Sequence, residues 1–145
     1  MQWILSTQPD TAALVARLIL AAVILPHGLQ KGFGWFGGYG VKNTLGYFRS
    51  IGIPNVFGML AIATETLAPL GLAPGLFGRV AALGVLAVMA TAALKVHLPS
   101  GFFMNWSGSQ KGEGFEYHLL AIGLASVILV LGSGAWSLDL LLAGR

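Results

Sequence analysis

The sequence contains no cysteine. Without thiols, the chain cannot form disulfide bonds, bind zinc or an iron–sulfur cluster through Cys side chains, or carry out thiol–disulfide exchange by itself. It also lacks a Walker phosphate loop, a GxSxG nucleophile motif, and the HExxH and Glu-x-x-His metal motifs. The glycine-rich stretch at residues 32–38 follows no strand pattern, so we do not interpret it as a phosphate loop, and we expect no metal site.

Charged residues are scarce. They make up 9% of the 145 residues, whereas 56% are hydrophobic, and an average soluble protein has about 25% charged residues. A soluble fold of this size needs more polar surface than the chain can supply, whereas a lipid bilayer favours apolar side chains on the outside. The net charge of +3 comes from scattered Lys and Arg residues, which suit membrane-edge anchors better than nucleic-acid binding. We therefore predict an integral membrane protein surrounded by lipid.

Four apolar segments approach the length of about 20 residues that a membrane-spanning helix requires. They predict a single all-α domain over residues 1–145, an integral membrane four-helix bundle with spans at about residues 11–31, 56–76, 79–97 and 117–138. With four spans, the two long loops lie at the same face of the membrane. We call this end of the predicted bundle the loop-side rim.

The linkers add two expectations. The turn around Ala73, Pro74 and Gly75 is short, so spans two and three should be antiparallel neighbours. In the longer linker between spans one and two, apolar residues recur near helical spacing at Val41, Leu45, Phe48 and Ile51. This spacing predicts a short interfacial amphipathic helix.

Glu65 is the only charged residue of the second predicted span and lies near its centre. An ionised carboxylate at this depth costs roughly 2.5–3.5 kcal/mol even on insertion scales, so it should face the interior and have a partner. Arg17 and His27 are the candidate partners. Two interpretations stay open: a structural polar contact between helices, or a carboxylate that handles protons or binds a ligand.

His27 and Lys31 are four residues apart and share one helix face. His27 and Glu65 are the candidates for catalytic proton exchange, and Lys31 is a candidate ligand contact whose alternative role is that of an interfacial anchor. His97 and Glu116 should reach the same loop-side rim from spans three and four. The predicted ligand-binding set is His27, Lys31, Glu65, His97 and Glu116.

The opposite end of the bundle carries Arg17, Arg79 and Asp139. Opposite charges at one depth in a membrane protein usually pair. We expect structural ion pairs there, in which Asp139 pairs with Arg17 or Arg79.

These residues, taken together and in this order, resemble the DoxX family of small bacterial membrane proteins. The resemblance covers about residues 12–141 and is carried by Arg17, the His27-Gly28-x-x-Lys31 element, GWFGGYG, Gly52-Ile53-Pro54, Glu65 in ATETLAPLGLAPGLFGR, Gly114-Phe115-Glu116-Tyr117 and GSGAWSLD. It implies a multi-pass four-helix protein of the bacterial inner membrane. The family takes its name from a subunit of an archaeal thiosulfate:quinone oxidoreductase, and other members are linked with thiol-redox complexes. Related proteins use cysteine pairs, from which this chain departs.

The resemblance and the residues together favour a redox-associated accessory subunit with a quinone-like or lipid-like ligand at the loop-side rim. The candidate cofactor is a quinone, and the candidate partners are the bilayer, a partner redox enzyme and further copies of the chain. A non-catalytic assembly factor and a small oligomeric transporter are the alternatives. Whether the protein is an enzyme stays open.

Overall fold

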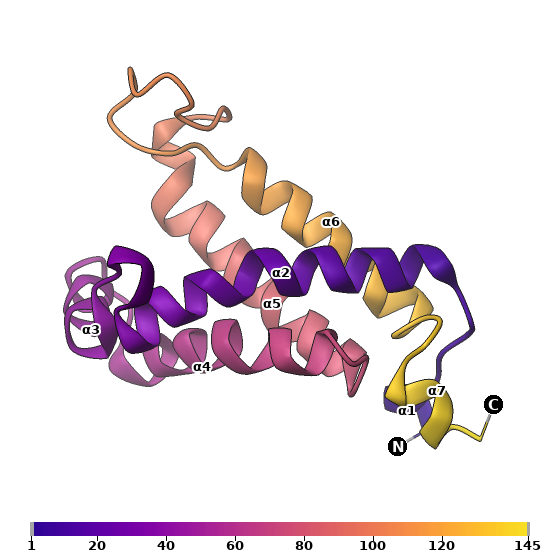
Figure 1. Ribbon diagram of the computed structural model, residues 1–145. Coiled ribbons are helices and arrows are strands. Elements are labelled where there is room, and N and C mark those ends of the chain that lie inside the picture. Colours follow the sequence, from indigo (N-terminus) through magenta and orange to yellow (C-terminus); the bar gives the residue numbers. More distant parts are fainter. Residues whose placement is uncertain (1, 145) are drawn as a thin grey trace.

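The computed structural model describes residues 2–144, which form α-helices, short helical turns and no β-strand (Figure 1). The α-helices are α1 (Gln2–Leu5), α2 (Thr11–Phe33), α3 (Gly40–Ser50), α4 (Asn55–Leu72), α5 (Gly78–Ala92), α6 (Glu116–Leu131) and α7 (Leu138–Leu142). The 3₁₀ turns are η1 (Trp35–Gly37) and η3 (Leu98–Ser100), and η2 (Ala93–His97) is a π-helical turn that continues α5.

The four long helices pack in a ring. α2 packs against α4 and α6, and α5 packs against the same two helices from the other side. In Figure 1, α2 and α4 lie along each other, and the α5–α6 pair crosses them. The α3 end of the first pair and the long loop of the second pair project in different directions, whereas the short helices α1 and α7 lie together at the opposite end.

Three helical stretches are long and apolar enough to cross a membrane: Thr11–Phe33, Asn55–Leu72, and Gly78–Ser100, in which α5 runs on through η2 and η3. These correspond to the first three predicted spans. Helix α6 is also apolar but has only 16 residues. The all-helical class is therefore confirmed, and three of the four predicted spans have the length and composition to cross a bilayer.

The fourth predicted span is too long, because α6 ends at Leu131 and not near Leu138. Gly132 and Gly134 adopt φ angles of 83° and 76°, a left-handed conformation that glycine reaches without steric cost. A Cβ at Gly134 would lie 2.5 Å from the Asp10 carbonyl oxygen, so the turn has no room for a side chain at this position. The apolar sequence continues past the end of the helix, and hydropathy alone therefore placed the boundary too late.

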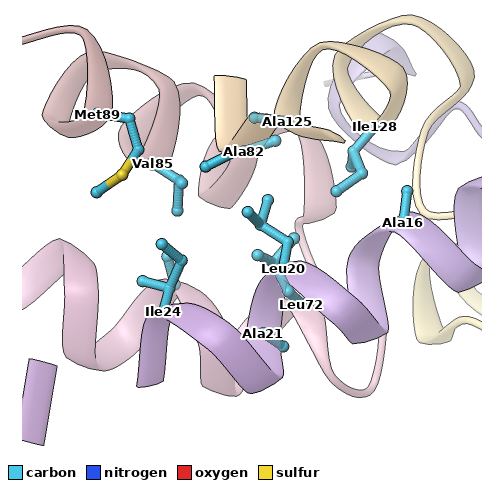
Figure 2. Packing of buried hydrophobic residues seen from close by; sticks show 12 residues of the cluster. Ala16, Leu20, Ala21, Ile24, Leu72, Ala82, Val85, Met89, Ala125 and Ile128 are labelled. Atoms are coloured by element: carbon cyan, nitrogen blue, oxygen red, sulfur yellow. The ribbon is translucent and has the colours of Figure 1, made fainter. Parts of the chain in front are cut away.

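The core lies where the two helix pairs cross. Figure 2 shows Leu20 of α2 and Leu72 of α4 facing Val85 of α5 and Ile128 of α6. All four side chains are almost completely buried. Many large apolar side chains instead point outward, among them Leu18, Ile19, Leu67, Leu120 and Val130. An apolar exterior around an apolar core is what a lipid-surrounded bundle requires.

The predicted amphipathic segment forms a helix, α3, which packs on α2 and α4. Its Leu45 and Phe48 side chains lie over Gly58, where an added Cβ would come within 2.8–2.9 Å of them. The missing side chain at Gly58 therefore lets α3 sit directly against α4. This contact fixes one wall of the site described next.

Candidate functional site

The buried carboxylate of Glu65 pairs with Lys31. The Lys31 Nζ lies 2.6 Å from both carboxylate oxygens of Glu65. Glu65 is 1% exposed, whereas the Lys31 side chain is 32% exposed. The pair therefore joins a buried acid on α4 to a base on α2 that still reaches open space.

Close packing of α2 on α4 makes this pair possible. A Cβ at Gly28 would lie 2.4 Å from the Glu65 carbonyl oxygen, a distance that no real Cβ tolerates. Gly28 thus sets the separation of the two backbones one helical turn before Lys31. Small residues at helix contacts in membranes allow this kind of approach.

A cavity of about 350 Å³ opens beside the pair, between α3, α4 and α5. Its polar side chains are Lys31, Thr64, Glu65 and Thr91. The rest of its wall is apolar and comes from Phe48 of α3, from Ile53, and from the facing sides of α4 and α5. We call this space the α4/α5 cavity. It has the size and character of a small-molecule site, being mainly apolar with a few placed polar groups.

Aromatic and imidazole rings form a row along the α6 side of the pair. The rings of His27 and Tyr117 lie 5.8 Å apart, those of Tyr117 and His118 lie 5.2 Å apart, and those of His118 and His97 lie 4.1 Å apart, centre to centre. Within the described residues, the buried Tyr117 hydroxyl and the buried His118 Nδ1 have no hydrogen-bond partner. Buried polar atoms normally have partners, so this row is the least satisfied polar region of the described protein.

The structure separates the predicted ligand-binding residues into two groups. Lys31 and Glu65 line the cavity. His27 is exposed next to Tyr117, His97 Nδ1 lies 2.9 Å from the Glu113 carbonyl oxygen, and Glu116 accepts a hydrogen bond from the Trp106 indole. These three residues do not line the cavity.

Glu65 takes neither of the partners that the sequence suggested. Its partner is Lys31, whereas Arg17 lies at the other end of the bundle. There the guanidinium donates to five backbone carbonyls: those of Leu72, Ala73, Ser133, Ala135 and Trp136. The Arg17 side chain is 1% exposed. It thus connects the C-terminal end of α4, where the last turn of a helix leaves its oxygens unbonded, with the turn that follows α6.

Asp139 also bonds to groups that the sequence did not suggest. Its carboxylate accepts hydrogen bonds from the backbone N–H groups of Phe77 and Gly78 and from the Ser133 hydroxyl, at 2.6–3.0 Å. It therefore caps the N-terminus of α5, where a negative charge is favourable. Between residues 2 and 144, the one ion pair within 4.0 Å is Lys31–Glu65.

The predicted ion pairs of Asp139 with Arg17 or Arg79 are therefore replaced by bonds to the backbone. Arg79 donates to the Val130 carbonyl at 3.1 Å and stacks over the Trp3 ring at 4.9 Å. The physical reason is shared by all three residues. Helix ends and turns meet at this end of the bundle, and their free carbonyl and N–H groups compete successfully for the charged side chains.

Sequence reasoning missed several contributors to the site. Phe48, Thr64 and Thr91 line the cavity. The helical spacing of Phe48 placed it on the apolar face of α3. No sequence signal indicated which apolar faces would enclose a space.

The family comparison matches most of this architecture. A family model described as DoxX matches residues 12–98, which include α2 to α5, the Lys31–Glu65 pair and the whole lining of the cavity. No curated protein and no solved structure matches the chain.

Proposed function

The chain belongs to the DoxX family, and on that premise we propose that it binds a quinone-like or lipid-like molecule in the membrane as an accessory subunit of a redox system. The ligand occupies the α4/α5 cavity. In this proposal α6 is the fourth span, so that the protein is a four-helix bundle of a bacterial inner membrane.

One observation carries the proposal: a buried ion pair forms the polar end of a cavity that is otherwise nearly apolar. An intramembrane acid and base are costly, and their presence favours a functional site. A purely structural pair would not need an adjoining space of about 350 Å³. An amphipathic ligand fits both features, since its polar head meets the pair and its apolar part meets the walls.

The two charged groups have complementary roles toward such a ligand. The Lys31 ammonium, which is partly exposed, donates a hydrogen bond to a carbonyl or phosphate oxygen of the ligand. Glu65 holds the ammonium in place through both of its carboxylate oxygens. Quinone reduction takes up electrons and protons; the partner redox enzyme would supply the electrons, and Lys31 and Glu65 are the groups on the cavity wall that can exchange protons.

Titration calorimetry in mild detergent with a short-chain benzoquinone tests the proposal. Lys31→Met and Glu65→Gln should each weaken binding by about tenfold or more, which is about 1.4 kcal/mol. The matched control is Lys42→Met, because Lys42 is exposed on α3 and does not line the cavity. Equal affinity for the wild type and both site variants would overturn the assignment.

A second variant separates loss of binding from loss of folding. Ala87 lines the cavity from α5 and is not part of the ion pair. Ala87→Leu should fill the space, weaken benzoquinone binding and leave the melting temperature close to that of the wild type. Unchanged binding by a folded Ala87→Leu protein would contradict the proposed location of the ligand.

Native mass spectrometry from mild detergent tests the accessory role. We expect a retained quinone or lipid together with the chain or with a partner redox enzyme. A stable protein partner with no small molecule would favour the assembly-factor alternative. Flux of a substrate into liposomes that requires oligomers of the protein would favour the transporter alternative.

A further inference from the structure

We infer that Thr64 is the second polar contact of the ligand and that it selects a quinone, a neutral ring with two carbonyl groups, over a lipid with a phosphate head. The Thr64 hydroxyl donates a hydrogen bond to one carbonyl oxygen, and the Lys31 ammonium donates to the other. This inference rests on the proposed function and deepens it, because it names the class of ligand and a residue that determines specificity.

The Thr64 hydroxyl differs from the other hydroxyls of its kind in the bundle. Four Ser and Thr side chains lie within α4, α5 and α6. Three of them, Thr66, Thr91 and Ser126, donate a hydrogen bond of 2.8 Å to the carbonyl four residues earlier, which is a common solution for a hydroxyl in a helix. Thr64 makes no hydrogen bond through its side chain to any described residue, so its hydroxyl is free to donate.

Open space lies beside this hydroxyl. Thr64 is half-buried and lines the α4/α5 cavity. Its oxygen is not among the completely buried side-chain atoms that lack a partner, so a ligand can reach it. Thr64 also borders a second space toward the turn between α4 and α5, whose other lining side chains are all apolar. A polar ligand bonded to Thr64 therefore finds its second polar partner on the cavity side.

Thr64 and the ion pair form one polar end of the cavity. Thr64 directly precedes Glu65, so the two side chains leave α4 about 100° apart, and the Lys31 Nζ lies 2.6 Å from the Glu65 carboxylate. Lys31 and Thr64 are the two groups of the lining with a donor to spare, since the hydroxyl of Thr91 already donates to the Ala87 carbonyl. Two donors suit a ligand with two acceptors.

The charge of the cavity favours a neutral ligand. Lys31 and Glu65 are its only charged lining side chains among the described residues, and their charges cancel. A phosphate would meet the Glu65 carboxylate as well as the ammonium, and like charges close together in a poorly solvated site repel each other. A quinone carbonyl accepts hydrogen bonds without bringing a charge, so it avoids this cost.

Two probes with the same short chain test the inference by calorimetry in mild detergent: a benzoquinone, and a cyclohexenone that has the ring but only one carbonyl. The wild type should bind the benzoquinone about fivefold more tightly, which is the effect of one hydrogen bond. Thr64→Val keeps the shape of the side chain and removes the hydroxyl. It should lower the affinity for the benzoquinone to that for the cyclohexenone, whose own affinity should stay unchanged.

Thr91→Val is the matched control, because Thr91 lines the same cavity but its hydroxyl is already bonded to the Ala87 carbonyl. It should leave both affinities unchanged. Thr64→Ser restores the hydroxyl and should restore the preference for the benzoquinone. Melting curves should show Thr64→Val to be as stable as the wild type, since no hydrogen bond within the protein is lost.

The outcomes separate this inference from the proposed function. If the wild type binds neither probe, the proposed function fails. If it binds the benzoquinone but Thr64→Val weakens neither probe, weakens both equally or acts like Thr91→Val, the function stands and the inference is overturned. Displacement of the benzoquinone by a short-chain phosphatidic acid would also overturn it, because the cavity would then accept a phosphate.

Discussion

At the end of the bundle near the terminal helices, buried charged side chains bond mainly to the backbone, whereas at the α3 end Lys31 and Glu65 bond to each other. Arg17 donates to five carbonyls, and Asp139 accepts from two backbone N–H groups and a hydroxyl. At the other end, Lys31 and Glu65 pair beside a cavity. Tyr117 and His118 each keep a buried polar atom without a partner among the described residues.

This difference indicates a division of roles along the bundle. We call the Arg17 end the closed end and the Lys31–Glu65 end the open end. Bonds to backbone groups fix the relative positions of α4, α5 and α6, so the closed end holds the helices together. The open end keeps a space beside a polar pair, which a ligand needs and a purely structural core avoids.

The largest effect should come from the closed end. Arg17→Lys keeps the charge but supplies only three donors, so at least two of the five hydrogen bonds are lost. Each unsatisfied buried carbonyl costs about 1–3 kcal/mol, and the free energy of unfolding should fall by about 2–6 kcal/mol. Thermal unfolding in detergent, followed by circular dichroism, measures this.

Arg49→Lys is the matched control, because Arg49 is exposed on α3. It should change the melting temperature little, since exposed charged groups contribute little to stability. If Arg17→Lys melts like Arg49→Lys, the closed end does not hold the bundle together and the comparison fails.

An intermediate effect is expected at Gly28, where α2 and α4 approach each other next to the Lys31–Glu65 pair. Gly28→Ala places a Cβ against the Glu65 backbone and should destabilise the fold by about 1–3 kcal/mol through overpacking. It should also weaken benzoquinone binding, because separating the helices moves Lys31 away from Glu65. Unfolding curves and calorimetry report the two effects separately.

Gly123→Ala is the matched control, because a Cβ at this helical glycine meets no atom within 4 Å. There the added methyl should stabilise α6 by roughly 0.5–1 kcal/mol. Equal effects at the two positions would mean that close packing at Gly28 does not shape the open end.

The smallest effect should be at His118. Its Nδ1 is buried and unpartnered in the described protein, so His118→Phe removes an unsatisfied polar atom while keeping an aromatic ring against Tyr117. We expect a melting temperature equal to or slightly above that of the wild type, with a gain of at most about 1 kcal/mol. A clear loss of stability would mean that the open end depends on this imidazole for its fold.

Hydrophobic runs were sufficient to predict the helical class and the positions of α2, α4 and α5, because a bilayer allows few alternatives to apolar helices. The spacing of Leu45 and Phe48 likewise predicted α3. The end of α6 could not be predicted in this way. Ala135, Trp136 and Leu138 keep the sequence apolar beyond Leu131, and the turn depends on the conformation of Gly132 and Gly134.

The site was predictable in its residues but not in its contacts. The cost of burying Glu65 indicated that it needs a partner, and Lys31 was among the candidates for the site. The close approach of α2 to α4 at Gly28 decides which basic side chain reaches Glu65. This approach is a feature of packing and cannot be read from the sequence. The bonds of Arg17 and Asp139 were not predictable, because free backbone groups at helix ends have no signature in side-chain sequence.

Photocrosslinking tests the central claim most directly. A benzoquinone with a photoreactive group on its ring, bound to the wild-type protein in detergent and then activated, should label peptides that contain Ile53–Glu65 and Gly84–Val96, and unlabelled benzoquinone should compete. Labelling spread evenly over the outward faces of all the helices, or unaffected by the competitor, would show that the cavity beside Lys31 and Glu65 is not a binding site.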